Sequence, residues 1–339
     1  MAEFLKRLSE EFGVSGNETA VRNLISEQIN GLADDITIDC MGNLIALKKG
    51  KSGEKNIAIT THMDEPGFIV SGINDKGYLQ FKAVGTIDPR KIISKKAVIG
   101  KNKIKGVIGM KAIHLQTKSE RENTVSVSKL FIDIGAKDKS DAEQYARLGD
   151  YVTFDTDFTE LDDNIKGKAI ERSGACAAVI DAMKFDYPFD TYFCFLTQHE
   201  VGSRGAKIIS HRLNTDAVLT VSAVDTADMF GCEKNTGGAM LGGGVVVSYA
   251  DKLVIADKEL TDAMAEEAKR KNIPVQKNAI KDFAGDGGAM QTGADGTICL
   301  NIAIPCRYSH SPVSIMSLND INNTTEYIKL YLNKIGELI

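Results

Sequence analysis

Residues 57–65 read Ile-Ala-Ile-Thr-Thr-His-Met-Asp-Glu, and this stretch decides the fold class. An apolar, β-branched run that ends at a histidine and two acids is typical of a buried strand leading to a polar edge. Three later runs of the same kind predict further buried strands, at residues 192–197, 217–222 and 298–304. Apolar residues at helical spacing lie between and after them, at residues 175–184, 257–272 and 319–338. Strand and helix alternate along the chain, which predicts an α/β fold.

The N-terminal segment has the pattern of a capped helix. Ser15 and Glu18 have the spacing of a capping box, in which each side chain accepts a backbone N–H of the first helical turn. Apolar residues follow at helical spacing, at Val21, Ile25 and Ile29. The sequence therefore predicts a helix that begins near Asn17.

Residues 65–160 differ from the rest of the chain. Their apolar pattern alternates in short segments, at residues 78–84, 104–109 and 151–154. A single helix is expected there, at residues 140–148. We therefore expect two domains: residues 1–64 and 161–339 form one α/β domain, and residues 65–160 form an inserted β-rich domain.

Composition excludes several classes of protein. The 339 residues include 41 basic and 46 acidic ones, a formal net charge of −5, and 43% are hydrophobic. These values are typical of globular proteins and argue against disorder and against nucleic-acid binding through bulk charge. The longest apolar runs, of about eight residues, are far shorter than the roughly 20 that span a bilayer. We expect a cytoplasmic protein with no membrane partner, whose six cysteines are reduced and serve in packing.

Polar side chains follow each of the four predicted strands. They are His62 after the first, His199 and Glu200 after the second, Asp225 after the third, and His310 after the fourth. Ligands of open α/β sheets bind beyond the carboxyl ends of the strands, so these groups are expected to converge there. Histidines and carboxylates together suit zinc or another divalent ion. Asp64 is placed to orient the imidazole of His62. Each residue alone also fits an ordinary structural role, and Asp64 equally fits a turn.

At these residues the chain resembles the tetrahedral, or glutamyl, aminopeptidase family of metallopeptidases, some members of which have been labelled endoglucanases. The resemblance rests on segments that occur in order along nearly the whole chain, at residues 13–18, 42–46, 62–68, 106–109, 133–137, 149–155, 200–206, 285–286 and 307–312. Their number, more than any single motif, makes the resemblance specific.

The resemblance implies a zinc-peptidase-like sheet sandwiched by helices, with an inserted β-barrel domain that helps subunits form a dimer or a twelve-subunit tetrahedron. It also implies two divalent ions, zinc or cobalt. In this chain His62 and Asp225 would hold one ion, and Glu200 and His310 the other. Glu171 falls where the family has a bridging Asp, and His199 falls where the family has a Glu that acts as general base.

Glu171 and His199 are departures from the family pattern, and so is Arg172. The family has an Asp, then an Asp or Asn, then an Arg, whereas residues 171–173 read Glu-Arg-Ser. His199 also replaces an anion by a group that is neutral or positive. The site should therefore carry less negative charge, and we expect weaker metal binding, with one ion tightly held at most.

Three functions are compatible with this pattern. The leading one is a metal-dependent aminopeptidase that releases N-terminal residues from peptides, with a neutral His199 as the base. The second is a weak or inactive homologue that acts as a binding or scaffold protein. The third is a glycosidase, which would need two free carboxyl groups across a sugar cleft. The spacing of the residues does not identify the preferred N-terminal residue.

Overall fold

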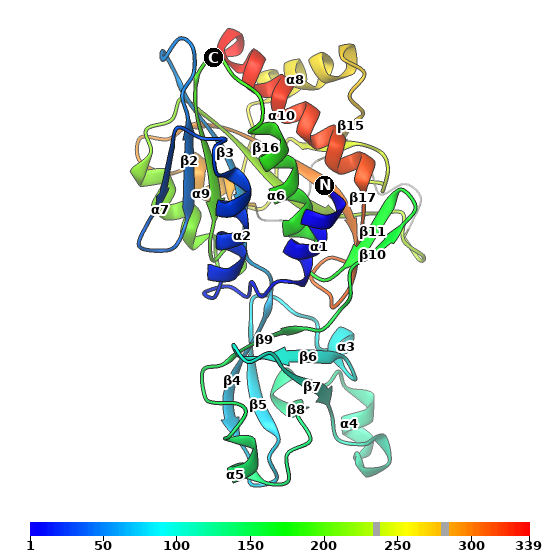
Figure 1. The fold of residues 1–339 in the computed structure, drawn as a ribbon. Coiled ribbons are helices and arrows are strands. Elements are labelled where there is room, and N and C mark those ends of the chain that lie inside the picture. The colour runs from blue at the N-terminus through cyan, green and yellow to red at the C-terminus, as the bar shows by residue number, and fades with distance from the viewer. Residues whose placement is uncertain (233–237, 279–284) are drawn as a thin grey trace.

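The computed structural model describes residues 1–232, 238–278 and 285–339. It has two parts, a large α/β body that contains both chain termini and a smaller β-barrel (Figure 1). The barrel strands lie between β3 and β10 in the sequence, so the body is built from two separate stretches of chain.

The body is built on one mixed sheet. Its main strand order is β1 (Asp35–Ile38), β2 (Leu44–Lys48), β12 (Asp190–Leu196), β3 (Asn56–His62), β13 (Ala217–Asp225), β16 (Ile298–Arg307), β17 (Ser314–Ser317), β11 (Asn164–Gly167) and β10 (Thr159–Leu161). β14 (Val245–Ser248) pairs with β16, and β15 (Val275–Asn278) with β14. The four neighbours β12, β3, β13 and β16 run parallel, so their carboxyl ends meet at one edge.

Helices cover both faces of this sheet. One face carries α1 (Ala2–Glu10), α2 (Thr19–Ile29), α6 (Ile170–Ala182), α8 (Lys258–Arg270) and α10 (Leu318–Leu338). The other carries α7 (Arg204–Arg212) and α9 (Gly287–Gln291). Alternation along β12 shows why both faces are buried: Phe193 and Phe195 pack against the first set of helices, while Cys194 and Leu196 pack against the second. The α/β sandwich is confirmed.

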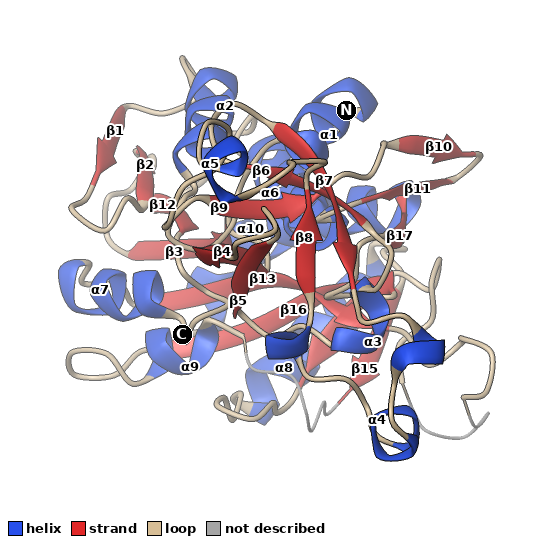
Figure 2. Ribbon diagram, turned by 90° about the horizontal axis from the view of Figure 1, so that it is seen from below, coloured by secondary structure: helices blue, strands red, loops and turns tan. Residues whose placement is uncertain are grey.

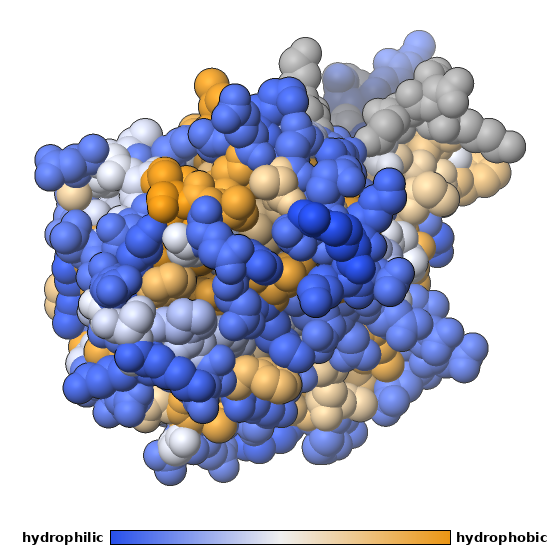
Figure 3. All heavy atoms as spheres, turned by 90° about the horizontal axis from the view of Figure 1, so that it is seen from above, coloured by the Kyte–Doolittle hydropathy of each residue, from blue (hydrophilic) through white to orange (hydrophobic). Residues whose placement is uncertain are grey.

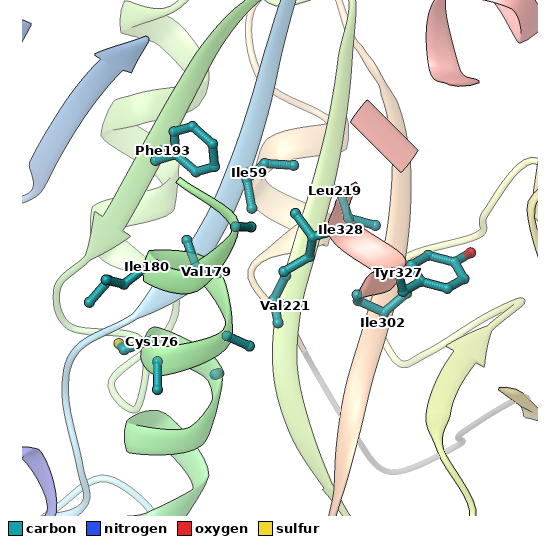
Figure 4. Packing of buried hydrophobic residues seen from close by; sticks show 14 of the residues in the cluster. Ile59, Cys176, Val179, Ile180, Phe193, Leu219, Val221, Ile302, Tyr327 and Ile328 are labelled. Atoms are coloured by element: carbon teal, nitrogen blue, oxygen red, sulfur yellow. The ribbon is translucent and has the colours of Figure 1, made fainter. Parts of the chain in front are cut away.

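The larger core lies between the sheet and α6 and α10 (Figure 4). Val179 of α6 and Ile328 of α10 project toward Ile59, Leu219 and neighbouring residues of the central strands, and all of them are buried. Almost the whole length of α6 is buried. Its glycine and alanine residues have small side chains, so the helix can approach the sheet closely. This packing fixes the strand ends that carry the polar residues.

Strands β4 to β9 form a closed barrel (Figures 1 and 2), which is the architecture that the family resemblance implied for the insertion. Around the barrel the strands run β4 (Gly67–Ile73), β5 (Leu79–Val84), β8 (Phe131–Asp133), β7 (Ile104–Gly109), β6 (Lys96–Ile99) and β9 (Tyr151–Phe154). It has a core of its own, which includes Phe68, Phe81 and Ile132. Alternate residues of β5 point inward and outward, which produces the period-2 pattern of the sequence.

The helix expected at residues 140–148 is wrong in its extent. The structure has only α5 (Lys139–Ala142) there, and two further short helices, α3 (Pro89–Ile92) and α4 (Lys118–Glu122), lie elsewhere in the insertion. Tyr145 and Leu148 are exposed, so a longer helix would bury no continuous apolar face.

The predicted capping box is also wrong. α2 begins at Thr19, and neither Ser15 nor Glu18 caps it with a side-chain hydrogen bond. The hydroxyl of Ser15 donates to Asp64 instead, and Oε1 of Glu18 accepts from the backbone N–H groups of Gly16 and Gln198 at 2.8 and 3.0 Å. Both side chains therefore bond to residues distant in the sequence, Asp64 and Gln198, and not to the start of α2.

The surface and the cysteines add two observations. In the described part of the chain, no helix is both long and apolar enough to span a membrane. The end of the body opposite the barrel is covered mainly by hydrophilic side chains, with apolar atoms in small patches (Figure 3).

All six cysteines are free, but Cys40 and Cys232 are exposed, so the prediction that all six serve in packing is wrong for these two.

Candidate active site

The polar residues predicted from the strand ends lie at the edge of the sheet that faces the barrel. His62 ends β3, Asp225 ends β13, and His199 and Glu200 follow β12 within four residues. The register of β12 and β3 brings His62 close to the loop that carries His199 and Glu200, because Leu196 of β12 pairs with His62 of β3. Thr86, which follows barrel strand β5, lines the same cleft as Glu200 and His310.

His62 is held by the main chain next to it. Its Nδ1 lies 3.1 Å from the carbonyl oxygen of Asp64, and its side chain is buried. This contact occupies Nδ1 and leaves Nε2 as the nitrogen that can bind an ion. The ring stacks on that of His199, with centroids 4.2 Å apart and planes inclined by 19°.

The carboxylate of Asp64 has a different contact from the one expected. Its Oδ1 is 3.7 Å from Nδ1 of His62, whereas its two oxygens accept the backbone N–H groups of His199 and Glu200, each at 3.0 Å. Ser15 donates a further hydrogen bond. Burial alone would raise the pKa of Asp64, but His62, His199 and Ser15 hold it well below its usual range. Asp64 therefore stays ionised and orients the loop after β12.

That loop is held by side chains from three other segments. The N–H groups of Thr197 and Gln198 donate to Asn43 and Glu18, at 2.9 and 3.0 Å, and the next two donate to Asp64. Gln198 has a φ of 55°, a left-handed conformation that is strained for a non-glycine residue. The sequence pattern missed Glu18 in this role, because its capping-box spacing suggested a local partner.

His199 also has a partner that the sequence analysis missed. Its Nδ1 lies 2.9 Å from Oδ1 of Asp286, and both side chains are buried. Burial alone would lower the pKa of His199, but Asp286, with help from Glu200 and Asp64, raises it to about 10. These carboxylates favour the protonated ring, and a neutral His199 that acts as base stays a prediction. The only sequence signal for Asp286 was its place in one of the family-like segments.

His310 and Glu200 form the outer part of the site. Nε2 of His310 lies 3.5 Å from Oε1 of Glu200, and this carboxylate raises the pKa of His310 to about 9 against the opposing effect of burial. The backbone N–H of His310 donates to Glu171, and that of Ser309 donates to Asp225 at 2.9 Å. Burial raises the pKa of Glu171. Two carboxylates thus hold the loop that carries His310.

Arg172 does not bring its positive charge into this cluster. Its guanidinium is 1% exposed and contacts the carbonyl oxygen of Glu11 at 3.1 Å and the carboxylate of Glu65 at 3.5 Å. Lys168 lies 2.7 Å from the same carboxylate oxygen. The charge loss expected at the site therefore rests on His199 and not on Arg172.

The gathered side chains fit a divalent ion in the kind of donor that they offer. His62, Glu171, Glu200, Asp225 and His310 supply two imidazoles and three carboxylates, the donors preferred by zinc and related ions. Within residues 1–232, 238–278 and 285–339, no three His, Cys, Asp or Glu side chains are already arranged around one ion position. Asp225 is exposed and the His310 side chain is 46% exposed, so both have room to turn.

A cleft of about 660 Å³ opens beside these residues. It is lined by Thr86, His199, Glu200, Gly202, Ser203, Lys207, Lys252, Leu253, Gly288, Ala289, Thr292 and His310. A hollow of about 700 Å³ in the barrel part contains none of the predicted site residues. Of these two, the cleft of about 660 Å³ is the one whose wall includes His199 and Glu200.

Comparison with known proteins finds relatives over nearly the whole chain. Residues 42–327 match the model of a family described as M42 glutamyl aminopeptidase. A putative aminopeptidase of Acetivibrio thermocellus is 37% identical over 330 residues, 97% of each chain. Among solved structures, aminopeptidase APDkam598 of the archaeon Desulfurococcus kamchatkensis superposes with a TM-score of 0.94 at 28% identity, covering 98% of this chain and 94% of that one. The TET1 peptidase of Pyrococcus horikoshii, described as assembling into a tetrahedron or a large octahedral shell, gives 0.87 at 28% identity over 98% and 99% of the two chains.

Proposed function

The chain belongs to the M42 glutamyl aminopeptidase family, and we propose that it is a metal-dependent aminopeptidase that releases N-terminal residues from peptides. One observation carries this proposal: histidines and carboxylates from four parallel strand ends meet beside a cleft of about 660 Å³. Clefts at this edge of a parallel sheet are where α/β proteins bind their ligands.

We propose that up to two divalent ions, zinc or cobalt, are held by His62, Glu171, Glu200, Asp225 and His310. Bound there, such ions would polarise the scissile carbonyl and lower the pKa of water. The carbonyl of Asp64 supports this reading, because it fixes the ring of His62 with Nε2 available. Glu171 keeps a carboxylate at the bridging position. It accepts a hydrogen bond from the backbone N–H of His310, so two of the proposed ligands are in direct contact.

We propose His199 as the residue that moves the proton. At a pKa of about 10 its ring is protonated at neutral pH and acts as a donor. Divalent ions held by the neighbouring ligands would lower this pKa by like-charge repulsion, and Nε2 of His199 would then be the atom that takes a proton from water and returns it to the leaving amine. Glu18 and Asp64 keep the residue in place through the backbone.

A second candidate is a weak or inactive homologue that binds peptides or acts as a scaffold. It is favoured by two features of the site, the cationic His199 and the lack of three ready donors around one point in the described residues. Loss of a general base typically removes about 10² to 10⁴ in rate.

We also propose a homo-oligomer, a dimer or a dodecamer, with the barrel at the contact. The tetrahedral assembly described for the P. horikoshii relative supports this proposal. Cytoplasmic location is proposed from the six free cysteines, since cytosolic thiols stay reduced.

The test is an assay of the purified protein against a panel of aminoacyl chromogenic substrates, with zinc, cobalt or manganese added. Metal-dependent turnover that Glu200→Gln abolishes would support the aminopeptidase. No turnover with any metal or substrate, in a protein that still binds peptides, would favour the inactive homologue.

A further inference from the structure

Asp286 reaches His199 from a distant part of the chain. The side chains of the two residues are 5% and 10% exposed, and Oδ1 of Asp286 is 2.9 Å from Nδ1 of His199. The N–H direction is poorly aligned with the carboxylate, so the contact is a buried ion pair more than a well-formed hydrogen bond. Little water screens such a pair, so the two groups are strongly coupled.

The ring of His199 has little freedom to turn. One of its faces stacks on His62, 4.2 Å away, and its backbone N–H is held by Asp64. His199 also lines the cleft. With Nδ1 turned to Asp286, the nitrogen left to meet a bound molecule is Nε2.

Asp286 is itself held firmly. It occupies the N-cap position of α9, and its carbonyl oxygen accepts the N–H groups of Ala289 and Met290, each at 3.1 Å. The next residue, Gly287, lies so close to Asn301 of β16 that a Cβ atom there would approach its Oδ1 to 2.2 Å. Helix α9 therefore packs directly against β16 with no space between them, and this close packing gives the carboxylate of Asp286 a fixed position.

We propose that Asp286 is a positioning residue for His199: it holds Nδ1 of the ring and thereby presents Nε2 to the cleft. The inference rests on the proposed function of His199. The proton passes between Nε2, the attacking water and the leaving amine, while Nδ1 keeps its own proton and Asp286 stays ionised. An Asp beside a catalytic imidazole fixes its tautomer and orientation in this way in other hydrolases.

The alternative is that Asp286 only neutralises a buried charge. In that role Asp286 would contribute to the stability of the fold, and the orientation of the His199 ring would not depend on it. The two roles differ in what a small carboxylate in solution can restore, because formate can replace an orienting carboxylate but cannot repair a destabilised fold.

The experiment compares Asp286→Ala and Asp286→Asn with the wild-type protein under the metal conditions that give the highest turnover. We expect kcat to fall about 10²- to 10⁴-fold while KM changes by less than about threefold. Added sodium formate should restore part of the kcat of Asp286→Ala and leave the wild-type protein unchanged. Asp251→Asn is the matched control, because Asp251 accepts from Asn301 at 2.9 Å in the same region and does not contact His199.

The control should lose stability without responding to formate. A kcat within a few-fold of wild type in both Asp286 variants would overturn the proposal, and so would a loss that formate does not restore. Should the wild-type protein have no activity, the proposed function fails, and a double-mutant cycle of His199→Gln and Asp286→Asn in urea unfolding still decides the pairing. Strictly additive losses of stability in that cycle would show that Asp286 does not hold His199.

Discussion

The imidazole rings of His62 and His199 stack with their centroids 4.2 Å apart and their planes at 19°. His62 ends β3 and His199 follows β12, and these two strands pair in parallel with Leu196 opposite His62. Sheet register thus brings together a proposed ion ligand and a proposed proton carrier. Because the two rings are in contact, a residue that holds His199 also bears on the position of His62.

Replacing His199 by Glu should strengthen metal binding. The change exchanges a cationic ring for an anion next to Glu200, and an added negative charge a few ångströms from a dication is expected to tighten binding by about tenfold or more. We expect more metal per subunit after loading with zinc and dialysis, and higher turnover. His114→Glu, the same change at an exposed barrel residue, is the control. Unchanged metal content and turnover in a wild-type enzyme that is already fast with two ions would refute this account of the site.

Removal of Glu18 should loosen the loop after β12. Its carboxylate is 4% exposed and accepts the N–H groups of Gly16 and Gln198. Glu18→Ala should lower the free energy of unfolding by about 1–3 kcal/mol and reduce kcat, since the loop carries His199 and Glu200. Glu18→Gln keeps an acceptor oxygen and should cost less. Urea unfolding and steady-state kinetics measure both effects, and the exposed Glu27→Ala should change neither.

The buried group formed by Glu65, Lys168 and Arg172 should be sensitive to loss of its single acid. All three side chains are at most 3% exposed, and burial lowers the pKa of Lys168. Glu65→Gln leaves two buried cations without a counter-charge and should destabilise the protein by about 3–5 kcal/mol. Adding Arg172→Met to that variant should recover part of the loss. If Glu65→Gln alone were as stable as the wild-type protein in thermal unfolding, the pairing of Glu65 with the two cations would be contradicted.

Acid should weaken the segment that leads to His310. The Arg307 guanidinium donates to Asp228 at 2.6 and 3.1 Å and lowers the pKa of that carboxyl to about 2. Because the folded-state pKa lies below that of the unfolded chain, the pair stabilises the fold above about pH 4 and its contribution disappears as the pH falls toward 2. Asp228→Asn should cost about 1 kcal/mol at pH 7, a value reduced for solvent screening, and almost nothing near pH 2. Denaturant unfolding at the two pH values checks this, and an equal cost at both would be the contrary result.

The charges that line the cleft should influence which N-terminal residue is preferred. Lys207 and Lys252 are exposed residues of its wall. We expect higher kcat/KM for glutamyl than for lysyl substrates, and Lys207→Glu should reduce the glutamyl value by about 2- to 10-fold. The leucyl substrate is the internal control and should change little. Faster cleavage of lysyl substrates by the wild-type protein would show that the two lysines do not set the preference.

The amino-acid sequence by itself determined the α/β body and the β-rich character of the insertion, whereas its closure into a barrel was implied only by the family resemblance. The apolar runs of β3, β12, β13 and β16 predict buried strands because burial on both faces leaves no polar position inside them. Alternation in β5 predicts a strand with one buried face. The polar residues that follow these runs then mark one sheet edge, so His62, Glu200, Asp225 and His310 were predictable as a group. Their roles as ligands stay predictions.

The tertiary structure decided which partner each polar side chain takes. Ser15 and Glu18 had the spacing of a local cap, yet they bond to Asp64 and to the loop after β12. Asp286 reaches His199 only because α9 packs on the sheet beside β13 and β16. The physical reason is that hydrophobic period is a local property of the chain, whereas a buried carboxylate must find whichever donors the packed core brings to it, and these come from segments far apart in sequence.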